Sequence, residues 1–298
     1  IKGDDTLQKN QLRNCVLFLL LCGIGGTTYA FQKLGLTTGL PLWSAGMRFS
    51  IAAMILIGWG IYRKKISYDR QSVITGIQYG VLYFTIPFGI IYWVGQYLPS
   101  GLLSVLSSSV AIFSILFHYF LYGQKTSKRQ IKGIVLSAAG IVCIFSDSLF
   151  SEYRGQMLGY LVISMIAYGG AAYATAMLKS NVSVIVPYTF NTVALLVGGI
   201  CLCTVSLLLE HGTRVFHGAA LFSLLYLAFA GSLLATRITT YLMSQWDVAQ
   251  VTAYRFISPV VALIIGFIFW GETLSMNEMA GAILIILGIA VINKPGDT

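Results

Sequence analysis

Charged side chains are scarce in this sequence. Asp, Glu, Lys and Arg make up 10% of its 298 residues, whereas a soluble domain usually carries about 25%. Hydrophobic residues make up 57%, and the mean hydropathy is +0.80. So few charges cannot cover a water-exposed surface, which excludes an ordinary soluble protein.

Motifs for chemistry on metals, phosphates or disulfides are also missing. None of the cysteines has Cys-x-x-Cys spacing, so neither a disulfide framework nor a zinc site is indicated. There is no Gly-rich phosphate loop and no His-Glu-x-x-His pattern, and no acidic pair at helical spacing within an apolar run. We therefore expect no enzyme, no metal, no cofactor and no use of ATP.

The hydrophobic residues occur in long continuous runs. A run of roughly 20 residues crosses a hydrocarbon core of about 30 Å as a helix, and a helix satisfies its own backbone hydrogen bonds in lipid. A β-barrel would need shorter, alternating segments. The sequence predicts an all-α membrane protein with ten transmembrane helices at about 14–34, 41–62, 72–94, 100–122, 131–149, 155–178, 183–209, 218–241, 249–270 and 276–293.

The distribution of basic residues predicts the orientation, because loops rich in Lys and Arg stay cytoplasmic. With both termini cytoplasmic, the outer side holds only Lys33, Arg154 and Arg214. The net charge of +9 is then a topology signal and gives no reason to expect nucleic acid; the lipid bilayer is the expected partner. The inner side holds Lys2, Lys9, Arg13, Arg63, Lys64, Lys65, Arg70, Lys125, Lys128, Arg129, Lys132, Lys179 and Lys294.

The chain also contains an internal repeat. A shift of 148 residues carries Gly133 and Gly140 onto Gly281 and Gly288, and the Tyr-Gly-Gln ending at residue 124 onto a Trp-Gly-Glu ending at residue 272. Glycines at this spacing are common in packed membrane helices, so they would be weak evidence alone. The matching loops strengthen the evidence for an internal repeat.

The repeat divides the chain into residues 14–150 and 155–293, with five predicted spans each. An odd number of spans places the second half upside down relative to the first. Inverted repeats related by an axis in the membrane plane are a transporter architecture, in which two halves rock around a shared site.

The second half carries a recognisable pattern: Ala-Tyr-Arg-Phe-Ile-Ser-Pro at 253–259, Trp-Gly-Glu-Thr-Leu at 270–274, then Gly281 and Gly288. The chain resembles the EamA-type module of the drug/metabolite transporter superfamily. The first half carries a weaker copy with Pro41 and Arg48, and departs from the pattern at Gln124, where the family often has Glu. It also has Ala111 where the second half has Pro259.

The resemblance implies a ten-span carrier of small metabolites in a bacterial cytoplasmic membrane, with export the commoner role. It also implies a central cavity surrounded by the third, fourth, eighth and ninth spans together with the first and sixth. We expect Pro259, Gly281, Gly288, Arg48 and Glu272 to have structural or hinge roles.

Arg255 is the strongest candidate for binding substrate. It precedes Pro259 by four residues, and proline cannot donate a hydrogen bond to the carbonyl of Arg255. A guanidinium at such a bend can bind a carboxylate through two parallel hydrogen bonds. The alternatives are that Arg255 extends to the cytoplasmic interface or pairs with Asp247.

Other candidates are weaker individually. Arg237 either contacts substrate or anchors its helix at the interface, and His118 is either a packing residue or a proton carrier, because histidine titrates near neutral pH. Tyrosines suit amphipathic metabolites but also form membrane-interface belts. The remaining predicted cavity residues are Tyr79, Tyr83, Trp93, Tyr168, Tyr173, Tyr254 and Gln78.

The sequence therefore predicts a secondary transporter of small organic metabolites, such as amino acids or related carboxylates, that works as a monomer by alternating access. Intramembrane arginines favour anionic or zwitterionic substrates, since a cation carrier would be expected to place carboxylates within its spans. The alternative is a flippase for lipids or polyisoprenoids, which shares the architecture.

Overall fold

The computed structural model describes residues 2–36, 40–63, 69–98, 100–123, 126–149, 156–270 and 276–293, and every regular element among them is a helix. Glu272 lies outside these residues. The helices are α1 (Lys2–Gly35), α2 (Pro41–Arg63), α3 (Arg70–Tyr79), η2 (Gly80–Thr85), α4 (Ile86–Val94), α5 (Ser100–Tyr122), α6 (Lys128–Leu149), α7 (Gln156–Asn181), α8 (Pro187–Leu209), α9 (Gly218–Tyr226), η3 (Leu227–Leu234), α10 (Ala235–Gln245), α11 (Val248–Thr252), α12 (Tyr254–Trp270) and α13 (Met276–Asn293).

Seven helical segments of the described chain are long and apolar enough to cross a membrane. They include two composite helices, α3–η2–α4 and α9–η3–α10. The predicted spans that correspond to α6, α12 and α13 are helical but do not belong to these seven. The segments are Asn10–Gly35, Pro41–Arg63, Arg70–Val94, Leu103–Tyr122, Gly159–Asn181, Pro187–Leu209 and Gly218–Gln245.

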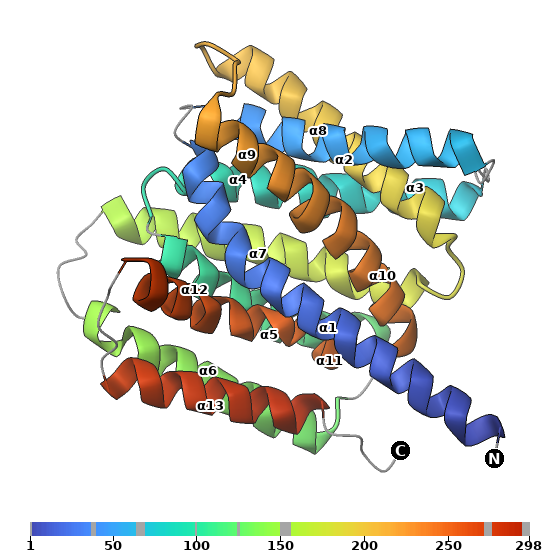
Figure 1. Ribbon diagram of the computed structural model, residues 1–298, viewed down its shortest axis with the longest axis vertical. Helices are drawn as coiled ribbons and strands as arrows, with labels where there is room; N and C mark the ends of the chain where they lie inside the picture. The colour runs from blue at the N-terminus through green and yellow to red at the C-terminus, as the bar shows by residue number, and fades with distance from the viewer. Residues whose placement is uncertain are drawn as a thin grey trace.

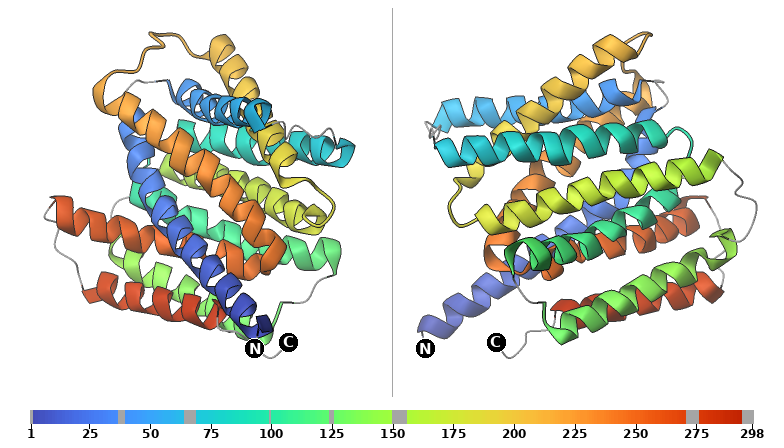
Figure 2. Two further views of the ribbon diagram at one scale, coloured as in Figure 1. Left: turned by 45° about the vertical axis from the view of Figure 1, so that its right-hand side comes forward. Right: turned by 180° about the vertical axis from the view of Figure 1, so that it is seen from behind.

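The helices form a bundle with a pair at each edge (Figure 1). α6 and α13 pack side by side at one edge, and α2 packs against α8 at the other. Between them, α1 crosses the bundle and contacts α9, α10 and α12, while α5 contacts α7 and α12. The first turn of α1 and the last turn of α13 lie at the same end of the molecule (Figure 2).

Glycines bring α6 and α13 into close contact. A Cβ atom added at Gly133 would lie 2.6 Å from the Gly288 carbonyl oxygen, and one at Gly140 would lie 2.6 Å from that of Gly281. Small residues let helix backbones approach this closely. The four glycines that mark the repeat in the sequence therefore meet each other in the fold.

The third and eighth predicted spans are not continuous α-helices. Each contains a π-helical segment at its middle, η2 in one and η3 in the other. In η2 the N–H of Ile86 donates to the carbonyl of Val81, and Pro87 follows directly. π-segments are rare and occur frequently at functional sites.

The ninth predicted span is also divided. α11 begins with a capping box, in which the Asp247 carboxylate and the Gln250 side chain bond reciprocally to backbone N–H groups. The α-helix is interrupted at Ala253 before α12 begins. This break places Tyr254 and Arg255 in the first turn of α12, facing the middle of the bundle.

Candidate functional site

A central cavity of about 80 Å³ lies among α1, α2, α3, η2, α4, α5, α7, η3, α10 and α12. A single water needs only about 10–15 Å³ by a comparable measure, so the cavity holds more than one small group. The third, fourth, eighth and ninth predicted spans, together with the first and sixth, all contribute to its wall.

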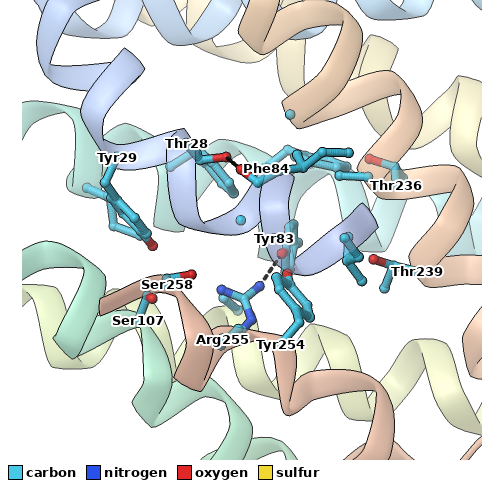
Figure 3. A pocket seen from close by; sticks show the side chains of 18 of the residues that line it. Thr28, Tyr29, Tyr83, Phe84, Ser107, Thr236, Thr239, Tyr254, Arg255 and Ser258 are labelled. Atoms are coloured by element: carbon cyan, nitrogen blue, oxygen red, sulfur yellow. Dashed lines mark hydrogen bonds between the residues drawn. The ribbon is translucent and has the colours of Figure 1, made fainter. Parts of the chain in front are cut away.

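Arg255 reaches into this cavity from the first turn of α12 (Figure 3). Its Nη2 donates a hydrogen bond of 2.5 Å to the hydroxyl of Tyr83. Its guanidinium carbon lies 5.2 Å from the ring centre of Tyr254 and 6.0 Å from that of Tyr83. Among the described residues the guanidinium makes no other hydrogen bond, so most of its five N–H donors remain available to a ligand.

The charge of Arg255 has no counter-ion in the cavity. None of the described lining residues is Asp or Glu, and Asp247 instead caps α11. The prediction that Arg255 pairs with Asp247 is therefore not supported. A partly buried cation without a counter-ion is costly inside a membrane, and an anion bound beside Arg255 would reduce that cost.

Arg48 also lines the cavity, but three of its five N–H donors are already used. Its Nε donates to Ser232 Oγ at 2.7 Å, its Nη1 to Tyr92 Oη at 3.1 Å and its Nη2 to the Gly231 carbonyl at 2.8 Å. The side chain is 1% exposed. Arg48 therefore joins α2 to η3 and α4, and Arg255 has more donors left for a ligand.

Four of the predicted tyrosines line the cavity: Tyr79, Tyr83, Tyr168 and Tyr254. The rings of Tyr79 and Tyr83 are stacked with centroids 4.6 Å apart. The hydroxyl of Tyr168 donates to the Leu103 carbonyl at 3.0 Å. The cavity wall beside Arg255 is therefore aromatic and bears hydroxyl groups.

Four other predicted residues do not line the cavity. Gln78 and Arg237 are exposed on the outside of the bundle, and Trp93 and Tyr173 are 39% and 37% exposed. Trp93 packs edge-on against Tyr97 and Tyr160, and Tyr173 against Phe117. The structure gives no support for substrate contact by these four side chains.

Several hydroxyl-bearing residues of the cavity were not predicted from the sequence. Tyr29, Ser107 and Ser258 place hydroxyl groups on one side of Arg255, with Tyr83 and Tyr254 on the other (Figure 3). Ser258 follows Tyr254 by one helical turn, so this spacing was a usable signal. The other missed hydroxyl residues are Thr28, Thr236, Thr239 and Thr240.

His118 lies apart from the central cavity. It is 7% exposed and borders a smaller cavity with Gln130 and Asp247. Its Nδ1 has no hydrogen-bond partner among the described residues. Nearby, Lys179 Nζ donates to the carbonyls of Met243 and Trp246 at 2.9 and 2.8 Å. These polar residues lie near the C-terminal ends of α5, α7 and α10.

The sequence is similar to those of known membrane proteins. The EamA-like transporter family matches residues 13–146 and again 157–294. The "Uncharacterized inner membrane transporter YedA" of Escherichia coli K12 is 27% identical, over 90% of this chain and 87% of that protein. The "Probable amino-acid metabolite efflux pump" of the same strain is 26% identical, over 93% of both chains.

A further relative and a solved structure are also similar to this chain. The "Uncharacterized transporter YcxC" of Bacillus subtilis is 25% identical, over 91% of this chain and 89% of that protein. A crystal structure with 13% sequence identity has the same fold, with a TM-score of 0.78 over 94% of this chain and 96% of the other. With two matches that together cover most of its length, this multi-pass membrane protein belongs to the EamA-like transporter family.

Proposed function

We propose that this protein is a secondary transporter of small organic carboxylates, with amino acids and related metabolites as the main class, and that it exports them. The observation that carries the proposal is Arg255, whose guanidinium faces the central cavity with one hydrogen bond and no acidic neighbour on the wall. A carboxylate can accept two parallel hydrogen bonds from such a guanidinium.

Two observations favour amino acids within this class. Hydroxyl oxygens of Ser107, Ser258 and Thr28 line the same cavity and can accept hydrogen bonds from an ammonium group. A relative of 26% identity is named a probable amino-acid metabolite efflux pump, which also supports the direction of transport.

We further propose that residues 14–150 and 155–293 are inverted five-helix repeats with ten spans in total and both termini cytoplasmic. The family matches the chain in two segments, and the repeat's shift carries η2 onto η3. The α6–α13 contact pairs Gly133 with Gly288 and Gly140 with Gly281. Such reciprocal pairing is expected across a two-fold axis.

The test is transport by the purified protein in liposomes, with a panel of amino acids and organic acids and with fluorescent phospholipids. We expect carboxylate flux that Arg255→Gln abolishes. Arg63→Gln is the matched control, because Arg63 lies at the exposed end of α2 against Trp59, and should transport normally. Equal flux in wild type and Arg255→Gln would rule out the carboxylate site. Phospholipid movement without solute flux would support the flippase instead.

A further inference from the structure

Tyr83 and Arg255 contact each other at weakened points of two helices. Pro87 follows Tyr83 by four residues, and Pro259 follows Arg255 by four. Proline has no N–H and cannot donate to the carbonyl four residues earlier. The hydrogen bond from Arg255 Nη2 to the Tyr83 hydroxyl, at 2.5 Å, therefore joins two residues whose backbone carbonyls cannot be bonded by the proline four residues later.

Tyr83 belongs to η2, and the residues before it pack closely against α8. A Cβ atom at Gly80 would lie 2.8 Å from the Ala194 carbonyl, and one at Gly76 would lie 3.1 Å from that of Phe190. These contacts pack the start of η2 tightly against α8. Any change of bend at η2 would therefore move α4 relative to α3.

The other π-segment is held differently. Arg48 makes two bonds to η3, one to the Gly231 carbonyl and one to Ser232 Oγ, and a third to Tyr92. Tyr83 and Gly231 occupy equivalent positions under the 148-residue shift. Each π-segment is thus contacted by an arginine from the other half of the chain, η3 through a network and η2 through a single hydrogen bond.

We propose that Tyr83 competes with the substrate carboxylate for Arg255, and that this exchange releases η2 and couples substrate binding to movement of α4. The proposal rests on the proposed function. Tyr83 offers the guanidinium one neutral acceptor, whereas a carboxylate offers two charged oxygens in matching geometry. A carboxylate that takes the Nη2 donor used by Tyr83 therefore displaces the hydroxyl, and Tyr83 acts as a positioning residue.

The experiment uses Tyr83→Phe, which keeps the ring stacked on Tyr79 and removes only the hydroxyl. Spin labels at Ile86 and Ile264, both exposed, report the distance from the start of α4 to α12. We expect Tyr83→Phe without ligand to show the distance distribution that acetate induces in the wild type, with chloride as the ionic control. Transport turnover should fall roughly tenfold while the equilibrium affinity for carboxylate rises.

Tyr188→Phe is the matched control, because it removes a tyrosine hydroxyl that donates to the Leu56 carbonyl between α8 and α2. It should leave the Ile86–Ile264 distance unchanged. Superimposable distributions for wild type and Tyr83→Phe would overturn the inference, as would a loss of carboxylate affinity equal to that of Arg255→Gln. If Arg255→Gln transports normally, the proposed function itself fails; if only Tyr83→Phe behaves as wild type, this inference alone fails.

Discussion

Two arginines share one cavity but have different surroundings. Arg48 is enclosed by three hydrogen-bond acceptors and by the rings of Phe49 and Phe88, whereas Arg255 makes one hydrogen bond. Residue type and depth in the span did not distinguish them. The difference comes from which acceptors the neighbouring helices supply.

Replacement of Arg48 should therefore impair folding before function. Arg48→Lys loses the planar fork and leaves some of its acceptors on Ser232, Gly231 and Tyr92 unsatisfied. We expect a loss of about 1–3 kcal/mol in unfolding free energy, measured by thermal unfolding in detergent. Arg63→Lys, at the exposed end of α2, should leave the midpoint unchanged. Equal midpoints for wild type and Arg48→Lys would contradict this account.

The side chains that line the cavity were only partly predictable. Tyr79, Tyr83, Tyr168, Tyr254 and Arg255 were found because the expected spans include them. Facing direction is harder to predict, because neighbouring residues on a helix point about 100° apart. Gln78 is thus turned away although Tyr79 lines the cavity.

At the scale of elements, π-segments change which way later side chains face. A π-turn holds more residues than an α-turn, so every side chain after it is rotated from the position expected for a regular helix. Trp93 follows η2 and Arg237 follows η3, and both are exposed. Hydrophobicity alone predicts where a span lies, but it does not show such a change of helical pitch.

The start of α2 depends on a cap from a distant segment. The Glu210 carboxylate accepts hydrogen bonds from the backbone N–H groups of Leu42 and Trp43, at 2.8 and 3.0 Å. An acidic cap at a helix N-terminus stabilises by about 1–2 kcal/mol, so Glu210→Ala should destabilise by that amount and Glu210→Gln by less. Thermal unfolding of the three proteins measures this order. A Gln variant less stable than the Ala variant would be inconsistent with capping.

Asp69 caps α3 and gives a pH-dependent contribution. Hydrogen bonds from the hydroxyl and backbone N–H of Ser72 hold the pKa of the Asp69 carboxyl below its usual value. The stabilisation is therefore present above the unfolded pKa of about 3.9 and is lost as the pH falls through the lower folded value. Unfolding midpoints of wild type and Asp69→Asn should converge in acid. A gap that is constant with pH would contradict this assignment.

Substitutions at the α6–α13 contact test whether its glycines are required for helix packing. Gly→Ala in a helix interior normally stabilises by about 1 kcal/mol. At Gly140 the new Cβ would lie 2.6 Å from the Gly281 carbonyl, so Gly140→Ala should destabilise by roughly 1–3 kcal/mol. Gly58→Ala is the control, since no atom lies within 4 Å of its added Cβ, and it should be neutral or stabilising. Stabilisation by both changes would mean that the two helices separate easily.

At the scale of the whole molecule, composition predicted a helical membrane protein, whereas the ten-span count and the inverted repeat stay predictions. Lipid requires backbone hydrogen bonds to be satisfied within each span, so hydrophobic runs map directly onto helices. The long predicted runs are helical over their described residues, and their boundaries lie within four residues of those observed except at the first, where α1 already begins at Lys2. The π-segments η2 and η3 and the interruption at Ala253 were not predicted, because hydrophobicity does not show them.

The proposed topology places opposite faces of the molecule in different compartments. Lys128, at the start of α6, is predicted to be cytoplasmic, and Thr213, between α8 and α9, is predicted to be external; both are exposed. In a variant without its native cysteines, a membrane-impermeant maleimide should label Thr213→Cys in intact cells, but Lys128→Cys only after lysis. Because the inverted repeat requires an odd number of crossings in each half, labelling of both positions from the same side would rule it out, even if carboxylate transport were confirmed.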